Sequence, residues 1–301
     1  MSRYAERTRP RSAARASAHA RARARGGGAR AMRKRFGQHF LEPAWVEKVV
    51  RAIDPKADET FIEIGPGRGA LTRPLAALTK SIVAYEIDRD LAADLRETAP
   101  PNVTIVEGDF LEANPEPRTP NPIRIAGNLP YNVASPILFR LVDLSRRGLP
   151  IVDATVMLQR EVADRLAAES GSRDYGVLSV LIQHRAAVER LLILPAGAFR
   201  PPPKVHSALV RLRFHPPNPA VRDESVLERV VHAVFTRRRK TLANALLALG
   251  GIPTRVRQVS DPGPTQAGAR AILAVAGLDG GRRPETLTVG EFARLADALS
   301  K

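Results

Sequence analysis

Residues 60–158 alternate between short apolar segments and segments whose apolar residues recur at helical spacing. The apolar segments have the length and composition of strands, and they lie at residues 61–64, 81–87, 103–106, 123–126 and 155–158. The segments between them have the pattern of helices, at residues 69–78, 89–98 and 135–144. This alternation predicts an α/β fold with a mostly parallel, doubly wound sheet that helices cover on both faces. In such a sheet, ligands bind beyond the carboxyl ends of the strands.

Further segments extend this sheet and then end the domain. A helical pattern at residues 43–53 precedes it, and two strand-type segments, 187–194 and 207–214, are expected to close it as an antiparallel pair. The run Pro216-Pro217-Asn218-Pro219 then breaks the chain. Beyond it, helical patterns occur at residues 225–235, 241–249 and 289–299. We therefore predict a sheet domain at residues 32–216 and a small α-helical domain at residues 217–301.

The composition excludes several classes of protein and site. No cysteine is present among the 301 residues, so disulfides and thiolate metal sites cannot form. The histidines show no metal-ligand spacing, and we predict no metal site. No apolar run approaches the roughly 18–20 residues that a membrane span requires, so we expect a cytoplasmic protein without a membrane partner.

A net charge of +16 indicates a polyanionic partner, and nucleic acid is the first candidate. Residues 1–31 hold nine arginines and one glutamate, so half of the excess lies in this tail and half in the body of the chain. The tail is rich in Arg, Ala and Gly without apolar periodicity, and we expect it to be disordered. It fits an RNA-binding arm, a transit-like presequence, or sequence upstream of a true start at Met32.

Three successive strand ends carry residues suited to an adenosine-containing cofactor. The first expected strand runs into a glycine-rich turn that opens at Gly65, where a ligand can approach the backbone closely. The second ends at Glu86, whose carboxylate can accept both hydroxyls of a ribose. The third leads to Asp109, which can accept from an adenine amine. The cofactor is then either a nicotinamide dinucleotide or S-adenosylmethionine.

The fourth strand end, Asn128-Leu129-Pro130-Tyr131, favours a methyltransferase. The exocyclic amine of adenine is a poor nucleophile, and a side-chain amide oxygen with a neighbouring backbone carbonyl can accept hydrogen bonds from it as it becomes tetrahedral. An aromatic ring can hold the base by stacking. The same tetrapeptide is also compatible with a plain Asn-x-Pro turn. A hydride-transfer enzyme has no evident use for it, whereas an amine methylase has.

Six motifs, taken in order, resemble those of the rRNA adenine N6-dimethyltransferase family. They read KRFGQHFL, EIGPGRG, EID, GDFL, GNLPY and FRPPPKVHSA, and they begin at residues 34, 63, 86, 108, 127 and 199. The resemblance extends over essentially all of residues 33–301. It implies a class I Rossmann-like methyltransferase sheet with a small C-terminal α-helical domain, and S-adenosylmethionine as the cofactor.

The resemblance also assigns cofactor contacts, each at a position that matches a family motif. His39 and Leu41 would contact the methionine end of the cofactor, and Gly65 would form the turn beneath it. Glu86 would bind the ribose and Asp109 the adenine. Position 39 is often Asn in this family, so His would serve equally well if the contact is made by the backbone.

The target adenine would be held by the GNLPY motif and by one further aromatic residue. Asn128 would lie beside the cofactor and orient the target amine together with the backbone carbonyl of Leu129. Tyr131 would stack on the flipped base, with Phe199 on its other side. No catalytic base is needed at first, because the sulfonium makes the methyl group a strong electrophile and the proton can leave to water.

Two motifs favour the housekeeping small-subunit group of this family, namely GNLPY and the segment FTRRRKTLANAL at residues 235–246. The implied reaction is dimethylation of two adjacent adenines near the 3′ end of small-subunit rRNA, by a monomeric enzyme. Arg237, Arg238, Arg239 and Lys240 are expected to open a helix against its macrodipole, a repulsion that RNA phosphates would compensate. Together with Lys204 they are the predicted RNA contacts. The alternatives are a macrolide-resistance (Erm) methylase of large-subunit rRNA and a non-catalytic nucleic-acid-binding relative.

Overall fold

A computed structural model describes residues 39–115, 122–251 and 265–300 of the chain. All of these residues belong to one compact unit, Gly37–Lys301. The tail predicted at residues 1–31 and the first part of the KRFGQHFL motif lie outside the described residues. None of the described helices is long and apolar enough to cross a membrane.

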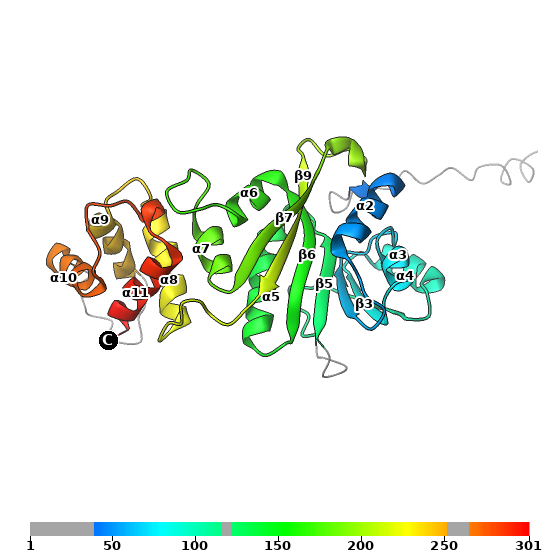
Figure 1. Cartoon of the computed structure of the whole chain (residues 1–301), viewed down its shortest axis with the longest axis horizontal. Helices are drawn as coiled ribbons and strands as arrows, with labels where there is room; N and C mark the ends of the chain where they lie inside the picture. Colours follow the sequence, from blue (N-terminus) through cyan, green and yellow to red (C-terminus); the bar gives the residue numbers. More distant parts are fainter. Residues whose placement is uncertain (1–38, 116–121, 252–264, 301) are drawn as a thin grey trace, which may run out of the picture. The chain divides into compact units, whose positions relative to one another are not determined.

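The centre of the fold is a seven-stranded sheet in the order β4-β3-β2-β5-β6-β9-β7 (Figure 1). Neighbouring strands are parallel from β4 to β6, whereas β9 runs antiparallel to both β6 and β7. The predicted parallel sheet and its closing antiparallel pair are therefore confirmed. The strands are β2 (Thr60–Ile64), β3 (Ser81–Glu86), β4 (Val103–Glu107), β5 (Ile123–Asn128), β6 (Ile151–Gln159), β7 (Ala186–Leu194) and β9 (Ser207–Phe214).

A second, two-stranded sheet joins two motifs that are far apart in the sequence. Its strands are β1 (Phe40–Leu41) and β8 (Phe199–Arg200), and Leu41 pairs with Phe199 in antiparallel register. The residues before β1 and after β8 are joined as well, because the His39 imidazole Nδ1 lies 2.6 Å from the main-chain oxygen of Pro201. The first and last motifs of the sheet domain thereby form one structural unit.

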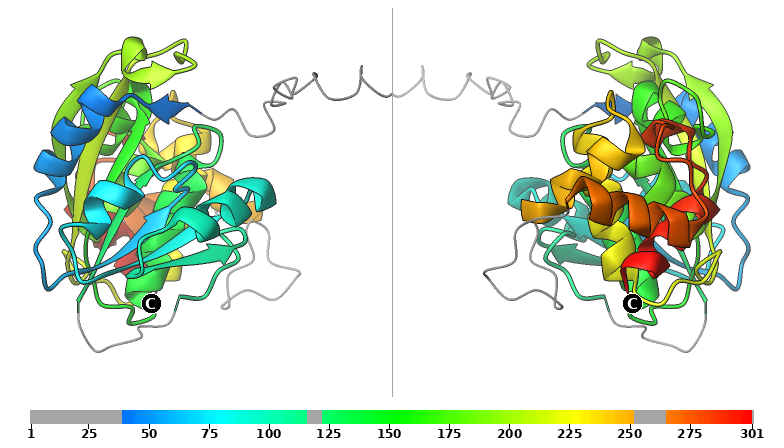
Figure 2. Two further views of the ribbon diagram at one scale, coloured as in Figure 1. Left: turned by 90° about the vertical axis from the view of Figure 1, so that its right-hand side faces the viewer. Right: turned by 90° about the vertical axis from the view of Figure 1, so that its left-hand side faces the viewer.

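Helices cover both faces of the large sheet (Figures 1 and 2). On one face, α2 (Pro43–Ile53) and α3 (Thr72–Ala76) pack over apolar side chains of β2 and β3. On the other face, α5 (Ala134–Arg146), α6 (Arg160–Leu166) and α7 (Val177–Gln183) enclose the larger core. A further helix, α4 (Arg89–Thr98), packs against β3 and β4.

Local signals fix where several of these helices begin. Pro43 occupies the first turn of α2, where its missing N–H removes no helical hydrogen bond. Asp88 caps α4, because its carboxylate accepts from the N–H groups of Asp90 and Leu91. Thr288 and Glu291 form a reciprocal capping box at the start of α11 (Val289–Leu299).

The C-terminal helices surround a hydrophobic core of their own. Besides α11, they are α8 (Glu224–Thr236), α9 (Leu242–Leu246) and α10 (Gln266–Ala276), with a 3₁₀ turn, η2, at Leu247–Gly251. Residues that precede the predicted boundary at 216/217 also belong to this core, among them Tyr175 and Val180. Helix α7 contributes Ile182 to the sheet core and Val180 to the helical core, so it is shared between the two.

Candidate active site

The predicted site residues of the sheet lie along one edge of it. Since β5, β2, β3 and β4 are adjacent and parallel, their carboxyl ends meet at this edge. The turn at Gly65 follows β2, Glu86 ends β3, Asp109 follows β4, and Asn128 ends β5. The topology therefore brings together residues that are up to 63 positions apart in the printed sequence. This placement is the one that open parallel sheets use for ligands.

Glu86 holds the glycine turn in place from within the protein. Its side chain is buried, its Oε2 accepts from the Gly67 N–H at 2.8 Å, and its Oε1 accepts from the Asp88 N–H at 3.0 Å. Gly67 has a φ of 58°, a left-handed conformation that a side chain disfavours. Burial raises the pKa of Glu86 above its usual range, and backbone N–H donors at Asp88, Gly67 and Ile87 partly offset this effect. A carboxylate has about four acceptor positions, so the side chain can still accept from a ligand hydroxyl.

A second buried carboxylate, Glu63, lies beneath the same turn. It is 1% exposed, and its Oε2 has no hydrogen-bond partner among the described residues. Burial raises its pKa to about 7, and the neighbouring charge of Glu86 adds to the rise. Sequence reasoning missed Glu63, although it is the first residue of the EIGPGRG motif. An acidic side chain within an otherwise apolar strand was the signal that could have identified it.

Asn128 is anchored through its side-chain nitrogen. Its Nδ2 donates to the main-chain oxygen of His39 at 2.8 Å, so the amide presents its oxygen as the acceptor. The imidazole of His39 stacks on the ring of Tyr131, with 5.6 Å between centroids and 28° between planes. Leu129 is buried, and its N–H donates to the main-chain oxygen of Met157 on β6 at 3.2 Å. The structure therefore brings His39 and the Asn128–Tyr131 tetrapeptide together.

The hydroxyl of Tyr131 is hydrogen-bonded to the start of β9, the strand that follows β8 in the chain. Its hydroxyl lies 2.6 Å from the Oγ of Ser207, the buried first residue of β9. Burial raises the pKa of the Tyr131 hydroxyl, and the bond to Ser207 opposes the rise. The ring is thereby fixed at its far end while part of it stays accessible.

Asp109 is partly exposed, whereas Leu41, the other predicted cofactor contact, is buried. One carboxylate oxygen of Asp109 accepts from the Leu111 N–H at 2.9 Å, which fixes the turn after β4. The next residue, Phe110, packs edge-on against Tyr85 with 5.4 Å between the ring centroids. Leu41 is 8% exposed and belongs to the core under α2.

The structure does not place Phe199 where the sequence resemblance predicted. Its ring is 1% exposed and packs in the core with Leu41 and Leu194. Pairing between β1 and β8 turns Phe199 inward, because Leu41 opposite it faces the same core. In this structure the ring is not available to stack on a base.

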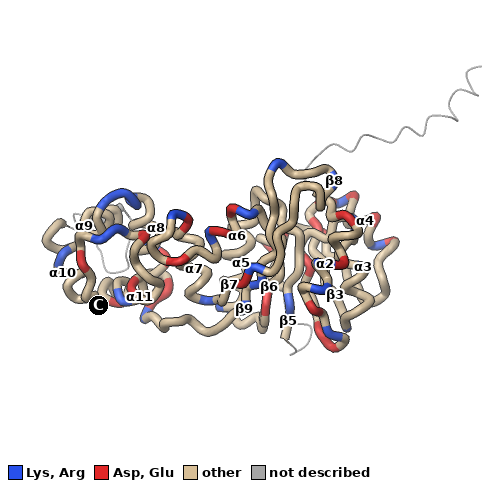
Figure 3. Tube along the Cα trace, turned by 45° about the horizontal axis from the view of Figure 1, so that its top comes forward, with Lys and Arg blue, Asp and Glu red and all other residues tan. Residues whose placement is uncertain are grey.

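The four predicted RNA-binding cations lie between two helices and not within the first turn of one. Helix α8 extends to Thr236 and α9 begins only at Leu242, so residues 237–240 form the turn between the two helices (Figure 3). Arg237 is the C-cap of α8, where the macrodipole favours a cation. Arg238 donates to the Ser172 main-chain oxygen at 3.2 Å. Lys240 directly precedes Thr241, the N-cap of α9, so the segment lies next to the positive end of that helix but outside it. Arg237, Arg239, Lys240 and Lys204 are exposed, as an RNA contact requires.

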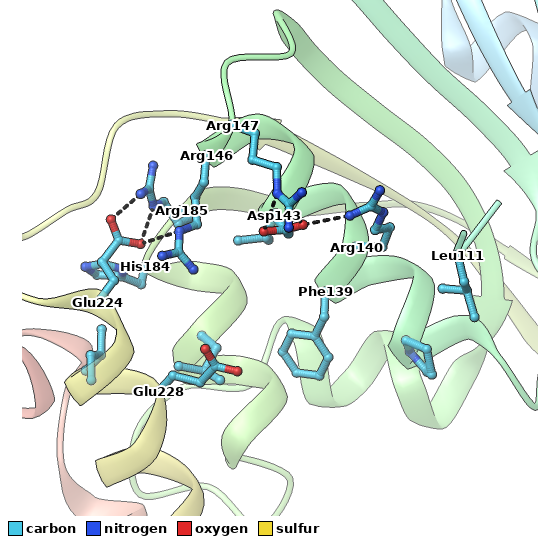
Figure 4. A pocket seen from close by; sticks show the side chains of 14 residues that line it. Leu111, Phe139, Arg140, Asp143, Arg146, Arg147, His184, Arg185, Glu224 and Glu228 are labelled. Atoms are coloured by element: carbon cyan, nitrogen blue, oxygen red, sulfur yellow. Dashed lines mark hydrogen bonds and ion pairs between the residues drawn. The ribbon is translucent and has the colours of Figure 1, made fainter. Parts of the chain in front are cut away.

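An arginine-rich groove lies between α5, α7 and α8 (Figure 4). Its volume is about 460 Å³. Glu224, the first residue of α8, accepts from Arg185 and lies 3.3 Å from the Arg146 guanidinium. Asp143 is shared in the same way by two arginines of α5 and the following turn. These cations are engaged within the protein, and the pairs of Glu224 join the start of α8 to Arg146 at the end of α5 and to Arg185, the residue before β7.

The residues at the strand-end edge fit S-adenosylmethionine. Two buried carboxylates, Glu63 and Glu86, lie beneath the glycine turn, and neither forms an ion pair within the described part of the chain. A cationic ligand suits such a pair, and the sulfonium of this cofactor carries the charge. Throughout the part of the chain that the structure describes, no group of His, Asp and Glu side chains could hold a metal ion. The fold and the site are those of a class I, S-adenosylmethionine-dependent methyltransferase.

Comparison with known proteins narrows this class to one family. The model of the ribosomal RNA adenine dimethylase family matches residues 29–260, and the chain belongs to that family. The "Ribosomal RNA small subunit methyltransferase A" of Chromobacterium violaceum is 42% identical over 270 residues, which are 89% of this chain and 95% of the relative.

Two solved structures resemble the chain over most of its length. A dimethyladenosine transferase from Plasmodium falciparum has a TM-score of 0.67 at 24% identity, covering 85% of this chain and 96% of that one. The 23S rRNA methyltransferase ErmE has a TM-score of 0.59 at 29% identity, covering 87% and 100%. At 24% identity, the likeness to the Plasmodium falciparum enzyme supports the fold alone.

Proposed function

We propose that this enzyme dimethylates N6 of two adjacent adenines near the 3′ end of small-subunit rRNA, within the ribosomal subunit. The observation that carries the proposal is the anchored amide of Asn128, which keeps its oxygen free to accept from an amine beside the glycine turn. A relative named for small-subunit rRNA is 42% identical, whereas the large-subunit enzyme ErmE is 29% identical. This difference favours the small-subunit substrate over the alternative of a macrolide-resistance methylase.

In the proposed reaction, the Asn128 oxygen and the Leu129 main-chain oxygen accept hydrogen bonds from the target amine. These bonds strengthen as the nitrogen becomes tetrahedral, so they stabilise the transition state more than the bound substrate. The ring of Tyr131 holds the flipped adenine by stacking. S-adenosylmethionine supplies a methyl group on a positively charged sulfur, and the amine proton leaves to water. The role of Phe199 in this reaction is indirect, because its buried ring packs in the core with Leu41.

For cofactor binding, we propose contacts from each strand end. Glu86 accepts from the ribose hydroxyls and Asp109 from the adenine amine, with the turn at Gly65 beneath the methionine end. Leu41 and the main chain of His39 complete the methionine contact, and the bond from Asn128 to the His39 oxygen supports it. Asn128 thereby serves the cofactor and the target base together.

For RNA binding, we propose the C-terminal helices at residues 217–301 and the exposed cations Arg239, Lys240 and Lys204. Arg237 and Arg238 shape the turn and add positive charge beside it. The sheet domain, residues 32–216, supplies the chemistry, and the arginines of residues 1–31 add positive charge that suits RNA. We further propose that the enzyme acts as a monomer in the cytoplasm, which sedimentation of the purified chain with and without RNA would test.

The central test is transfer of labelled methyl groups from S-adenosylmethionine to small ribosomal subunits that lack the modification. Wild type is expected to transfer four methyl groups, two to each adenine, as mass spectrometry of nuclease fragments would show. Asn128→Ala is expected to transfer almost none. Asn132→Ala removes an exposed amide four residues along and is the matched control.

The alternatives predict different outcomes in the same experiment. Methylation of free large-subunit rRNA in place of the small subunit would support the Erm-type function. Transfer by wild type no greater than that by Asn128→Ala would contradict catalysis and favour a nucleic-acid-binding relative without activity.

A further inference from the structure

Glu63 and Glu86 are neighbours on one face of the sheet. In the parallel pairing of β2 with β3, Phe61 lies opposite Ile82 and Glu63 opposite Ala84. Since side chains alternate along a strand, Glu63 faces the same side as Phe61, and Glu86 the same side as Ala84. Both carboxylates are almost fully buried, at 1% and 3% exposure. They therefore approach each other under the glycine turn in a largely apolar setting.

Within the part of the chain that the structure describes, the elements packed around Glu63 bring it no cation. Its strand neighbours are Ala84 and Ala126, and α3 contributes the hydroxyl of Thr72. Glu86 is the charged side chain that acts on Glu63, and Asp88 acts in turn on Glu86. The charges in this neighbourhood are thus negative.

The nearest arginines of the turn and of α3 are turned toward other groups. The guanidinium of Arg68 lies over the ring of Phe40, 4.8 Å from its centroid. Arg73 donates to the main-chain oxygen of Arg68 and, at 3.0 Å, to the hydroxyl of Thr98. Neither contact directs a positive charge at Glu63.

A carboxylate that is buried without a neighbouring positive charge holds a proton more firmly than one in water. Desolvation and the charge of Glu86 raise the pKa of Glu63 to about 7, and its Oε2 lacks a partner among the described residues. The free protein therefore has a neutral carboxylic acid beneath the turn in part of the physiological pH range. A ligand that brings a positive charge would stabilise the ionised form.

We propose that Glu63 is the residue by which this site distinguishes the cationic methyl donor from its neutral product. Below neutral pH the free protein holds a proton on Glu63, and entry of the sulfonium breaks the O–H bond and releases that proton to solvent. After methyl transfer the sulfur is a neutral thioether, so Glu63 takes a proton back and the product is held less firmly. The inference rests on the proposed cofactor site. Glu63 is in this sense a specificity residue and takes no part in bond making at the methyl group.

The sign of the pH dependence follows from this linkage. A bound cation lowers the pKa of Glu63, so affinity for S-adenosylmethionine rises as pH rises toward about 7 and levels off above it. With a free-state pKa of about 7, affinity gains about tenfold between pH 6 and pH 8. S-adenosylhomocysteine lacks the sulfonium charge, and its affinity changes little over the same range.

Titration calorimetry of the full-length protein tests this inference. Each ligand is measured between pH 6 and pH 8 in two buffers of different ionisation enthalpy, which gives the number of protons released. At pH 6, S-adenosylmethionine is expected to release most of one proton and S-adenosylhomocysteine almost none. Glu63→Gln should abolish the release and the tenfold shift in the ratio of the two affinities. Glu47→Gln removes an exposed carboxylate of α2 outside the site and should leave both intact.

Three outcomes are decisive against the inference or its basis. Equal proton release by the two ligands in wild type would overturn the role of Glu63, even if Glu63→Gln failed to fold. Unchanged release in a folded Glu63→Gln variant would overturn it as well. Failure of S-adenosylmethionine to bind at any pH would contradict the proposed cofactor site itself, which separates the two claims.

Discussion

The side-chain amide of Asn128 donates a 2.8 Å hydrogen bond to the main-chain oxygen of His39. This bond joins the end of β5 to the residue that precedes β1, two parts of the chain that are 89 residues apart. Because the acceptor is a main-chain atom, the bond does not depend on the side chain at position 39. It does depend on a nitrogen donor at position 128, which an aspartate would lack.

We therefore expect His39→Asn to bind S-adenosylmethionine almost as wild type does, within about threefold, or roughly 0.7 kcal/mol. Asn128→Asp has nearly the same shape but places a carboxylate against the His39 oxygen, and it should lose affinity and methyl transfer together. Calorimetry and single-turnover kinetics measure the two effects. A loss of more than tenfold in His39→Asn would show that the imidazole itself contributes to the cofactor site.

Tyr131→Phe separates the ring from its hydroxyl. The variant loses the 2.6 Å bond to Ser207 and leaves a buried hydroxyl without its partner, at a cost of about 1–3 kcal/mol in the free energy of unfolding. Methyl transfer should change little, because the ring that stacks on the base is retained. Tyr131→Ala should lower kcat/KM for RNA by roughly tenfold to a hundredfold.

Urea unfolding and steady-state kinetics of the same variants check this expectation. Ser207→Ala removes the other hydroxyl, and the double variant Tyr131→Phe/Ser207→Ala should be less destabilised than the sum of the two single changes. Strict additivity would mean that the two hydroxyls do not interact.

Much of the fold was predictable from the sequence, because strong local signals and the tertiary structure agree. Helices α2, α4 and α11 have the predicted bounds, and each begins at a local start signal. Helices α6 and α7 were not predicted, since seven residues are too few to establish a helical period. Helix α10 was missed because its sequence, QAGARAILAVA, is apolar on most of its circumference.

The candidate site was predictable only as a set of strand ends. Glu86, Asp109 and Asn128 follow from the topology, but their hydrogen-bond partners do not, because those partners come from distant segments. The inward turn of Phe199 depends on the pairing of β1 with β8, which no local pattern announces. The bounds of α8 agree with the predicted helix to within one residue, but the role of Arg237 as its C-cap depends on cap geometry that the sequence pattern does not give.

Gly127→Ala should directly disturb β5, the strand that ends at Asn128. A Cβ at this position would lie 2.5 Å from the main-chain oxygen of Ile64 on β2, closer than atoms can approach. The strands must separate to admit it, at a cost of about 1–3 kcal/mol or more, and Asn128 moves with the strand. We expect a lower midpoint in urea unfolding and a loss of methyl transfer.

The matched control for this change is Gly197→Ala. A Cβ at Gly197 would meet no atom within 4 Å, so its effect on stability should stay within about 0.5 kcal/mol. Equal stability of the two variants would show that β2 and β5 are not packed as closely as described.

The cofactor-free protein should become less stable as pH rises past neutrality. The pKa of Glu63 is raised from 4.5 to about 7 in the folded state, so the folded protein keeps a proton that the unfolded chain has lost. Stability therefore falls as pH rises through this window, by about 3 kcal/mol in total and by about 1 kcal/mol between pH 6 and pH 8.

Urea unfolding at the two pH values measures this loss. Glu63→Gln should remove the part of the pH dependence that arises from Glu63, so that its stability relative to wild type is greater at pH 8 than at pH 6. Glu47→Gln removes an exposed carboxylate of α2 and should leave the wild-type dependence intact. A constant difference between wild type and Glu63→Gln at both pH values would contradict the assignment.

The turn between α8 and α9 should bind RNA through Arg239 and Lys240. Arg239 and Lys240 are exposed, whereas Arg238 is engaged with the Ser172 main-chain oxygen and lies 3.9 Å from Glu285. Arg239→Gln/Lys240→Gln should therefore leave the fold intact. If each cation contacts a phosphate, the slope of log affinity against log salt concentration falls by about 0.7 to 0.9 for each contact removed.

The control is a variant that removes the same net charge elsewhere. Arg51 and Lys80 are exposed cations, and Lys80 directly precedes β3, at the opposite edge of the sheet from Glu86. Arg51→Gln/Lys80→Gln tests whether net charge alone steers the RNA, since a general field would weaken binding equally in the two variants. Direct contact at the turn predicts a reduced slope only in Arg239→Gln/Lys240→Gln, measured by RNA binding at a series of salt concentrations. Equal slopes would place the RNA contacts outside this turn.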